Sequence, residues 1–267
     1  MDLKLTGASV VITGGASGIG LATARTFAAE GAGIVLWDQS DKVSETAREL
    51  SEETGQSVSG LQVDITDFAA VQKTTDQTVA QTSKITHLVH AAAIGSGKFG
   101  FPFTNLTPTD WPRVFEVNMQ GMVHVAHAVA PVMQEAGTGS MIFISSIAGQ
   151  IGSQTDPPYS ASKAANINFA QCLAKDLAKH GIRVNSVCPA GGNPQMYGPW
   201  LPKMASMTET LRHYGENRGI PGTVSFDAIA GAVLYLASDL SEHVTGIDLP
   251  VDGGATAGKY LDGFSSL

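Results

Sequence analysis

The chain has 267 residues, of which 43% are hydrophobic and 15% charged, and its formal net charge is −8. The low charged fraction argues against a disordered chain, and the apolar fraction is large enough for a substantial core. The negative balance disfavours nucleic-acid binding, because phosphate backbones need a basic protein face.

Short apolar runs alternate with longer helical segments along the whole chain. The runs are rich in Val and Ile and continuous, as expected of strands buried on both faces. We predict strands at 8–13, 33–38, 59–64, 86–92, 140–145, 182–188 and 246–252. We predict helices at 18–30, 41–54, 67–82, 109–136, 157–180 and 225–237. This order predicts an α/β fold, a Rossmann-type doubly wound parallel sheet with helices on both faces, in a single domain over 1–267.

A glycine cluster, "TGGASGIG", follows the first predicted strand directly and precedes a helix. Its glycines are Gly14, Gly15, Gly18 and Gly20. Glycine permits a tight turn and lets the backbone approach a pyrophosphate, while the helix start supplies unpaired N–H groups. The position of the cluster in the first strand–turn–helix unit indicates a dinucleotide site.

Two aspartates follow the next two predicted strands. Asp38 ends the second strand, 18 residues beyond Gly20, where a dinucleotide fold places an acid for the adenosine ribose. The alternative for Asp38 is a cap on the helix that begins near Asp41. Asp64 ends the third strand, and there capping by Asp64 or Thr66 competes equally with adenine recognition.

The segment "DPPYSASK" predicts a helix start with Asp156 as its cap. Tyr159 lies in the first turn, and Lys163 follows one turn later on the same face. The pKa of a free tyrosine is about 10, and both the helix start and the lysine favour the phenolate. Ser145 or Ser146 ends the fifth strand nearby, where a hydroxyl can hold a substrate oxygen while the phenol exchanges its proton.

Taken together, "TGGASGIG", "VNMQG", "ISS", "YSASK", "VNSVCP" and "LPVDGG" resemble the short-chain dehydrogenase/reductase family, in its short single-domain branch, over nearly the whole chain. The resemblance implies a catalytic set of Asn118, Ser146, Tyr159 and Lys163. Tyr159 would be the general acid/base, Ser146 would orient the substrate oxygen, and Asn118 would support a proton-relay water. Lys163 would lower the phenol pKa and bind the nicotinamide ribose. The residues implied in cofactor binding are Gly14, Ser17, Gly18, Ile19, Gly20, Asp38, Asp64, Ile65, Ala92, Tyr159, Lys163, Pro189 and Gly192.

The chain departs from the family pattern at two places. It reads "HAAA", from His90 to Ala93, where the family usually reads "NNAG", and we interpret His90 as a structural substitute. After the sixth strand it reads "PAGGNP", so that Ala190 replaces a glycine and Pro194 replaces the threonine that ordinarily hydrogen-bonds the nicotinamide carboxamide. The backbone of Gly192 could serve instead.

The segment 189–224 interrupts the alternation of strands and helices and is rich in Pro, Met and Trp. At the carboxyl end of a strand it could be an apolar substrate lid, or its side chains could simply cover the core. His124 and His127 stand three apart, but without a third ligand we expect exposed or subunit-interface histidines and no metal. The two cysteines, Cys172 and Cys188, suit free thiols in a reduced cytoplasmic protein, and no segment reaches the length of a membrane span.

The sequence therefore predicts an NAD-dependent oxidoreductase that interconverts a secondary alcohol and a ketone on a small, mostly apolar substrate. NAD is expected over NADP because Asp38 would repel the additional phosphate of NADP. Two alternatives remain: an NADP-preferring reductase of the same family, or a dinucleotide-binding sensor or scaffold without turnover. The resemblance also implies a homotetramer, with the helices 109–136 and 157–180 at its interface and no nucleic-acid or membrane partner.

Overall fold

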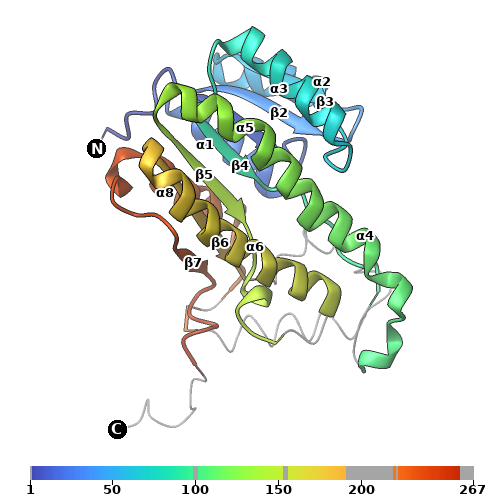
Figure 1. The fold of residues 1–267 in the computed structure, drawn as a ribbon. Helices are drawn as coiled ribbons and strands as arrows, with labels where there is room; N and C mark the ends of the chain where they lie inside the picture. The colour runs from blue at the N-terminus through green and yellow to red at the C-terminus, as the bar shows by residue number, and fades with distance from the viewer. Residues whose placement is uncertain (1, 99–101, 153–155, 191–218, 221, 259–267) are drawn as a thin grey trace, which may run out of the picture.

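Seven strands form one sheet in the computed structural model (Figure 1). The structure describes residues 2–98, 102–152, 156–190, 219–220 and 222–258. Every pair of neighbouring strands is parallel, and their order is β3-β2-β1-β4-β5-β6-β7. The strands are β1 (Ser9–Thr13), β2 (Gly33–Asp38), β3 (Val58–Gln62), β4 (His87–His90), β5 (Gly139–Ile144), β6 (Ile182–Pro189) and β7 (Asp248–Val251). The prediction of a doubly wound parallel sheet is confirmed.

The strand order reverses between β1 and β4. β1 has β2 on one side and β4 on the other, although β4 comes later in the chain. In open α/β sheets, ligands bind outside the carboxyl ends of the strands at such a switch point. The glycine cluster follows β1, and His90 ends β4. The fold therefore brings both predicted segments to this edge of the sheet.

Helices cover both faces of the sheet. On one face, α1 (Gly18–Ala29), α2 (Val43–Thr54) and α8 (Phe226–Ala237) share a core with the strands. On the other, α3 (Phe68–Thr82), α5 (Met122–Ala136) and α6 (Pro157–Leu177) do the same, and α5 and α6 cross the front of the sheet in Figure 1. Val10 belongs to the first core and Val11 to the second. Burial on both faces explains why the apolar runs are continuous.

The predicted helix 109–136 is wrong as one continuous element. A 3₁₀ turn, η2 (Pro108–Asp110), precedes a short helix, α4 (Pro112–Phe115). A π-helical segment, η3 (Glu116–Gly121), then leads into α5. A π-helical segment changes the hydrogen-bond register without breaking the apolar pattern, so periodicity does not reveal it. Asn118 lies within this segment.

Several predicted boundaries are shifted. β3 ends at Gln62 and β4 at His90, so both strands are shorter than predicted and Asp64 lies beyond its strand. α6 ends at Leu177, and a 3₁₀ turn, η5 (Ala178–His180), completes the predicted segment. Most of the predicted lid, including Gly192 and Pro194, lies outside the described residues.

Candidate active site

The glycine turn after β1 needs glycine for two different reasons. Gly14 and Gly18 have φ angles of +66° and +54°, a region that side chains disfavour. A Cβ on Gly14 would lie 2.9 Å from the Ala92 backbone nitrogen, and a Cβ on Gly20 would clash with the Gly14 carbonyl oxygen. The turn therefore packs tightly against both the start of α1 and the segment after β4.

The start of α1 carries no side-chain cap. Ser17 is the N-cap residue, but its side chain makes no capping hydrogen bond, and the first turn has no acidic residue. An uncapped helix start presents N–H groups and a partial positive charge, which suit a phosphate. Around Gly18 there is open space, since a Cβ there would meet no atom within 4 Å. These features fit the pyrophosphate of a dinucleotide.

Asp38 lies at the tip of β2 and reaches back to the glycine turn. Its Oδ2 accepts a hydrogen bond of 3.0 Å from the Ala16 N–H, and its Oδ1 accepts one of 2.9 Å from the Ser40 N–H. α2 begins at Val43 without a side-chain cap, so the alternative reading of Asp38 as a helix cap is wrong. The carboxylate is instead held next to the glycine turn, where lone pairs remain for further donors.

The capping alternative for Asp64 or Thr66 is also wrong. Asp67 caps α3, accepting a hydrogen bond of 3.1 Å from the Ala70 N–H. Asp64 Oδ1 accepts bonds from the Thr66 N–H and hydroxyl at 2.9 and 2.8 Å, and the backbone bond lowers the pKa of the Asp64 carboxyl. The neighbouring Ile65 is buried and lies against Gly121.

α6 begins as predicted, with Asp156 as its cap. The Asp156 carboxylate accepts a hydrogen bond of 3.3 Å from the Tyr159 N–H, which places Tyr159 in the first turn. One turn later, the Lys163 ammonium lies 5.5 Å from the centre of the Tyr159 ring. It donates a hydrogen bond of 2.7 Å to the Ile144 carbonyl. The predicted phenol and lysine are therefore neighbours on one face.

Lys163 is buried, with 2% of its surface exposed. Loss of hydration disfavours its charged form and lowers the pKa of Lys163 to about 8. Cys188 lies close enough to be affected by Lys163, and burial raises the pKa of its thiol to about 12. Cys188 is therefore a neutral thiol in the buried surroundings of Lys163, a placement that no sequence motif predicted.

The two serines after β5 have different partners. The Ser145 hydroxyl donates a hydrogen bond of 2.8 Å to the Lys163 carbonyl oxygen. The Ser146 hydroxyl accepts one of 3.1 Å from the Ala148 N–H, at the start of the 3₁₀ turn η4 (Ile147–Gly149), and keeps its own proton for another acceptor. The structure therefore favours Ser146 over Ser145 as the hydroxyl that could hold a substrate oxygen.

Asn118 connects three segments of the chain. Its side chain exchanges two hydrogen bonds with the backbone of Ile94, at 2.8 and 2.9 Å, and donates a third of 2.9 Å to the Ser162 hydroxyl. Its own carbonyl oxygen accepts a hydrogen bond of 2.9 Å from the Asn166 side chain. Ser162 and Asn166 are buried on α6. Neither residue is among the predicted site residues, although two polar residues four positions apart on one face of a helix are a signal that could have identified them.

His90 joins β4 to β1. Its Nδ1 lies 3.0 Å from the Thr13 hydroxyl oxygen, which accepts hydrogen bonds from the N–H groups of Ala91 and Ala92. The hydroxyl proton is therefore directed at Nδ1. Complete burial lowers the pKa of His90 to about 3, so the ring is neutral. This agrees with a structural role for the first residue of "HAAA".

The two histidines of α5 contact residues of their own chain. His124 Nδ1 lies 2.9 Å from the Ile65 carbonyl oxygen, and the rings of His124 and His127 both contact Phe68. His124 is half-buried and His127 is exposed. Within the described ranges, no group of three His, Cys, Asp or Glu side chains could hold a metal ion, and no helix is both long and apolar enough to cross a membrane.

The predicted site residues that the structure describes thus lie at the carboxyl edge of the sheet, in the segments that follow β1 to β5 and at Pro189, which ends β6. A family model described as enoyl-(acyl carrier protein) reductase matches residues 14–256. The chain belongs to the short-chain dehydrogenase/reductase family. As a member of this family, the chain is a dehydrogenase/reductase. Its strand order and its glycine turn are those of a dinucleotide-binding fold.

Relatives within this short-chain dehydrogenase/reductase family cover nearly the whole chain. Momilactone A synthase of Oryza sativa subsp. japonica is 35% identical over 262 residues, 98% of this chain and 94% of the relative. Cis-4-hydroxycyclohexanecarboxylate dehydrogenase of Sinomonas cyclohexanicum is 34% identical, with 92% and 96% covered. The structure of a gluconate 5-dehydrogenase from Burkholderia cenocepacia J2315, in complex with NADP and tartrate, has a TM-score of 0.87 at 31% identity, with 96% of this chain and 98% of that chain covered.

Proposed function

We propose that this family member interconverts a secondary alcohol and a ketone with NAD(H), on a small and mostly apolar substrate. The observation that carries the proposal is the buried ammonium of Lys163 next to the ring of Tyr159, with the Ser146 hydroxyl at the end of the neighbouring strand. A binder without turnover has no need of this arrangement. A phenol beside a buried cation is suited to move a proton.

In this mechanism the phenol of Tyr159 exchanges a proton with the substrate oxygen, as general acid in reduction and general base in oxidation. The Ser146 hydroxyl donates its proton to the same oxygen and orients it. The charge of Lys163 stabilises the phenolate, and Asn118 holds the segment at Ile94 against α6. A bound nicotinamide would supply or accept the hydride.

The test is Tyr159→Phe, which removes the exchangeable proton and keeps the ring. We expect kcat to fall roughly 10²- to 10⁴-fold, the usual contribution of a general acid/base group. Binding of NADH, measured by fluorescence titration, should stay within about threefold of the unmodified protein. A Phe variant that keeps more than about a tenth of kcat would refute the role of Tyr159.

The preference for NAD rests on Asp38. Its carboxylate is held at the glycine turn, and the neighbouring Ser17 and Gln39 are not basic. An additional phosphate there would face the negative charge of this carboxylate, and two such charges 4 Å apart repel each other by about 4 kcal/mol at a dielectric constant near 20. Screening by solvent and salt leaves roughly 30- to 1000-fold discrimination.

The matching experiment compares kcat/KM for NAD and NADP on the unmodified protein and on Asp38→Ala. We expect NAD to be preferred, and Asp38→Ala to weaken NAD and admit NADP. The related gluconate 5-dehydrogenase holds NADP, so an NADP-preferring reductase is the second candidate. Equal or higher kcat/KM with NADP on the unmodified protein would favour it.

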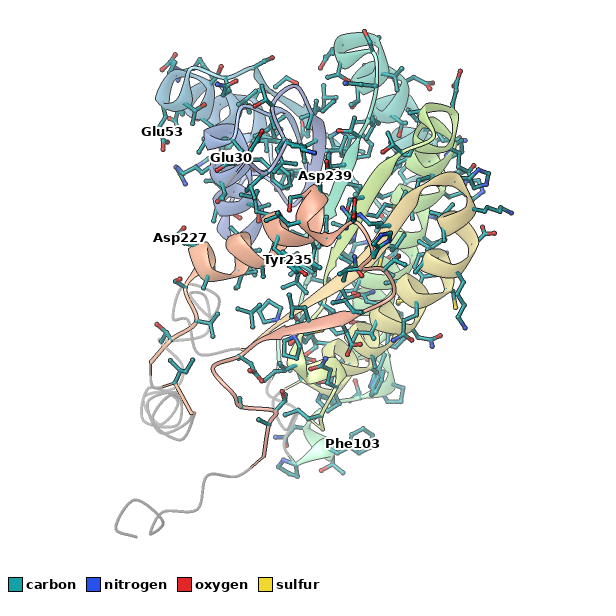
Figure 2. The ribbon with its side chains drawn as sticks, turned by 90° about the vertical axis from the view of Figure 1, so that its left-hand side faces the viewer. Glu30, Glu53, Phe103, Asp227, Tyr235 and Asp239 are labelled. Atoms are coloured by element: carbon teal, nitrogen blue, oxygen red, sulfur yellow. The ribbon has the colours of Figure 1, made fainter. Side chains whose placement is uncertain are left out.

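An apolar substrate is supported by the surface around the site. Exposed apolar side chains stand on the loops after β4, β5 and β6: Phe103, Ile151 and Ile220, at 63%, 42% and 73% exposure. Figure 2 shows Phe103 at the lower end of the described part of the chain. One relative is named for an alicyclic hydroxy acid. A screen in which polyols outperform alicyclic secondary alcohols would refute this class.

We also propose a homotetramer that uses the outer faces of α4, α5 and α6. A surface hollow on this side is lined by Pro112, Phe115, Glu116, Met119 and Gln120. Partly exposed Phe115 and Met119 make it suitable for contact with another copy. Light scattering after size-exclusion chromatography tests the assembly, and a monomer at micromolar concentration would refute it.

A further inference from the structure

The carboxylate of Asp156 holds two separate segments of the chain. Its Oδ1 accepts the hydrogen bond from the Tyr159 N–H that caps α6. Its Oδ2 accepts a shorter one, of 2.7 Å, from the Ser96 N–H in the segment after β4. These two backbone groups are 63 positions apart in the chain, so one side chain joins the site loop directly to the first turn of the catalytic helix.

A helix cap alone requires only one of these bonds. Asp67 caps α3 through a single hydrogen bond from Ala70 N–H, and the Ser225 hydroxyl caps α8 in the same way from Ala228 N–H. At α6 the second carboxylate oxygen of the cap also accepts a hydrogen bond, from the Ser96 N–H on the loop after β4. The bond is charge-assisted, a class about twice as strong as neutral hydrogen bonds.

Gly95 gives room to the close approach of the two segments. A Cβ at this position would lie 2.9 Å from Asp156 Oδ2, closer than real Cβ contacts allow. Gly95 therefore leaves the space that the carboxylate occupies. Two residues therefore make this contact possible: the N-cap Asp156 of α6 and a glycine on the loop.

A second connection lies two residues away. Asn118 holds both backbone groups of Ile94 and donates to Ser162, whose hydroxyl donates a hydrogen bond of 2.7 Å to the Tyr159 carbonyl oxygen. The loop at Ile94–Ser96 is thus tied to the backbone N–H of Tyr159 through Asp156 and to its carbonyl through Asn118 and Ser162. The backbone N–H and the backbone carbonyl of Tyr159 are therefore both fixed relative to the same loop.

We propose that Asp156 is a positioning residue for the reaction, a bridge that fixes the loop at Ile94–Ser96 relative to Tyr159. The inference rests on the proposed function, in which Tyr159 exchanges the proton. Proton transfer requires heavy atoms within hydrogen-bond reach, and an error of about 1 Å in such a site can cost about 100-fold in rate. Releasing the bridge should lower kcat more than it changes KM.

The test is Asp156→Ser, paired with Asp67→Ser as a matched control. Serine is as good an N-cap as aspartate, so it keeps the start of α6, but one short hydroxyl cannot also serve the Ser96 N–H. We expect kcat of Asp156→Ser to fall roughly 10- to 100-fold at saturating cofactor, with KM for substrate within about threefold and the melting temperature nearly unchanged. Asp67→Ser should keep kcat within about twofold, because its carboxylate serves only its own helix.

Amide hydrogen exchange reads the bridge without turnover. In Asp156→Ser, the Ser96 amide should exchange faster, while amides in β4 keep their protection. Unchanged exchange at Ser96, or faster exchange with unchanged kcat, would overturn the positioning role. Failure of the proposed function is recognised separately, since Tyr159→Phe would then stay active whatever Asp156→Ser does.

Discussion

Two helices begin at the carboxyl edge of the sheet, and their first turns are built in opposite ways. α1 begins at Gly18, whose φ angle is positive, and its first turn has no side-chain cap and no acidic residue. α6 begins with two prolines, which have no N–H, and the Asp156 carboxylate fills the position that an external anion could take. One helix start is open to a ligand, and the other is closed by its own chain and carries the phenol.

The two helix starts rely on different parts of the chain. At α1 the backbone conformation presents the binding groups, so no charged side chain has to be buried. At α6 the arrangement depends on ionisable side chains, Asp156 and the buried Lys163. Substitutions at the start of α1 should therefore act by changing the backbone conformation, and substitutions at α6 by changing charge. The variants below distinguish these two kinds of effect.

Of the variants that test this comparison, the largest effect is expected from Gly18→Ala at the open helix start. The φ of Gly18 is +54°, and a Cβ there meets no protein atom, so the substitution adds strain of about 1–2 kcal/mol without a clash. The methyl group would occupy space that a pyrophosphate needs. We expect Kd for NADH to rise about 100-fold, or about 2.7 kcal/mol, by calorimetric titration.

The matched control for Gly18→Ala is Gly55→Ala. Gly55 ends α2 with a φ of +69°, and a Cβ there also meets nothing within 4 Å. The strain is equivalent, but the position is not part of the candidate site. Equal Kd values for the two variants would contradict a phosphate site at Gly18.

Much of this comparison could be predicted from the sequence. Buried parallel strands have continuous apolar runs, and glycine clusters and helix caps are local signals, so the sheet, the glycine turn and the start of α6 at Asp156 were all anticipated. Family resemblance supplied the roles of Ser146, Tyr159 and Lys163, and the structure places the last two together.

The remaining features are long-range or depend on register. Asp156 was identified as a cap, but its bond to Ser96 joins residues that only the fold brings together. The π-helical segment around Asn118 keeps an apolar pattern, so it was predicted as ordinary helix. The neutral state of His90 depends on complete burial. A sequence contains none of these distances.

A smaller effect, on stability, is expected from Lys163→Met. Burial lowers the pKa of Lys163 from 10.5 to about 8, so between these values the unfolded chain binds more protons than the folded one. Stability of the unmodified protein therefore rises with pH in this window, and the cost of burying the charge is fully present below about pH 8. Relative to Lys163→Met, the unmodified protein should gain about 2 kcal/mol between pH 7 and pH 10.

Urea unfolding of both proteins at the two pH values measures this gain. Methionine removes the buried charge but leaves the Ile144 carbonyl without its donor, so the sign of the difference at pH 7 alone is not diagnostic. Its change with pH is diagnostic. If the difference in unfolding free energy between the two proteins stays constant from pH 7 to pH 10, burial does not disfavour the charged form of Lys163.

The smallest effect tests the comparison directly, by giving α1 the kind of start that α6 has. Ser17→Asp places a carboxylate at the N-cap, where it can accept from a backbone N–H and interact favourably with the helix dipole. We expect the free energy of unfolding to rise by about 0.5–1 kcal/mol. The same carboxylate would repel the pyrophosphate, so Kd for NADH should rise about tenfold, or about 1.4 kcal/mol.

Ser17→Asn offers a neutral cap of nearly the same shape and isolates the charge. Because Ser17 is exposed, the weakening in the Asp variant should shrink as salt is raised, while Ser17→Asn should show little salt dependence. Equal Kd values for the Asp and Asn variants at low salt would mean that no anion binds at this helix start.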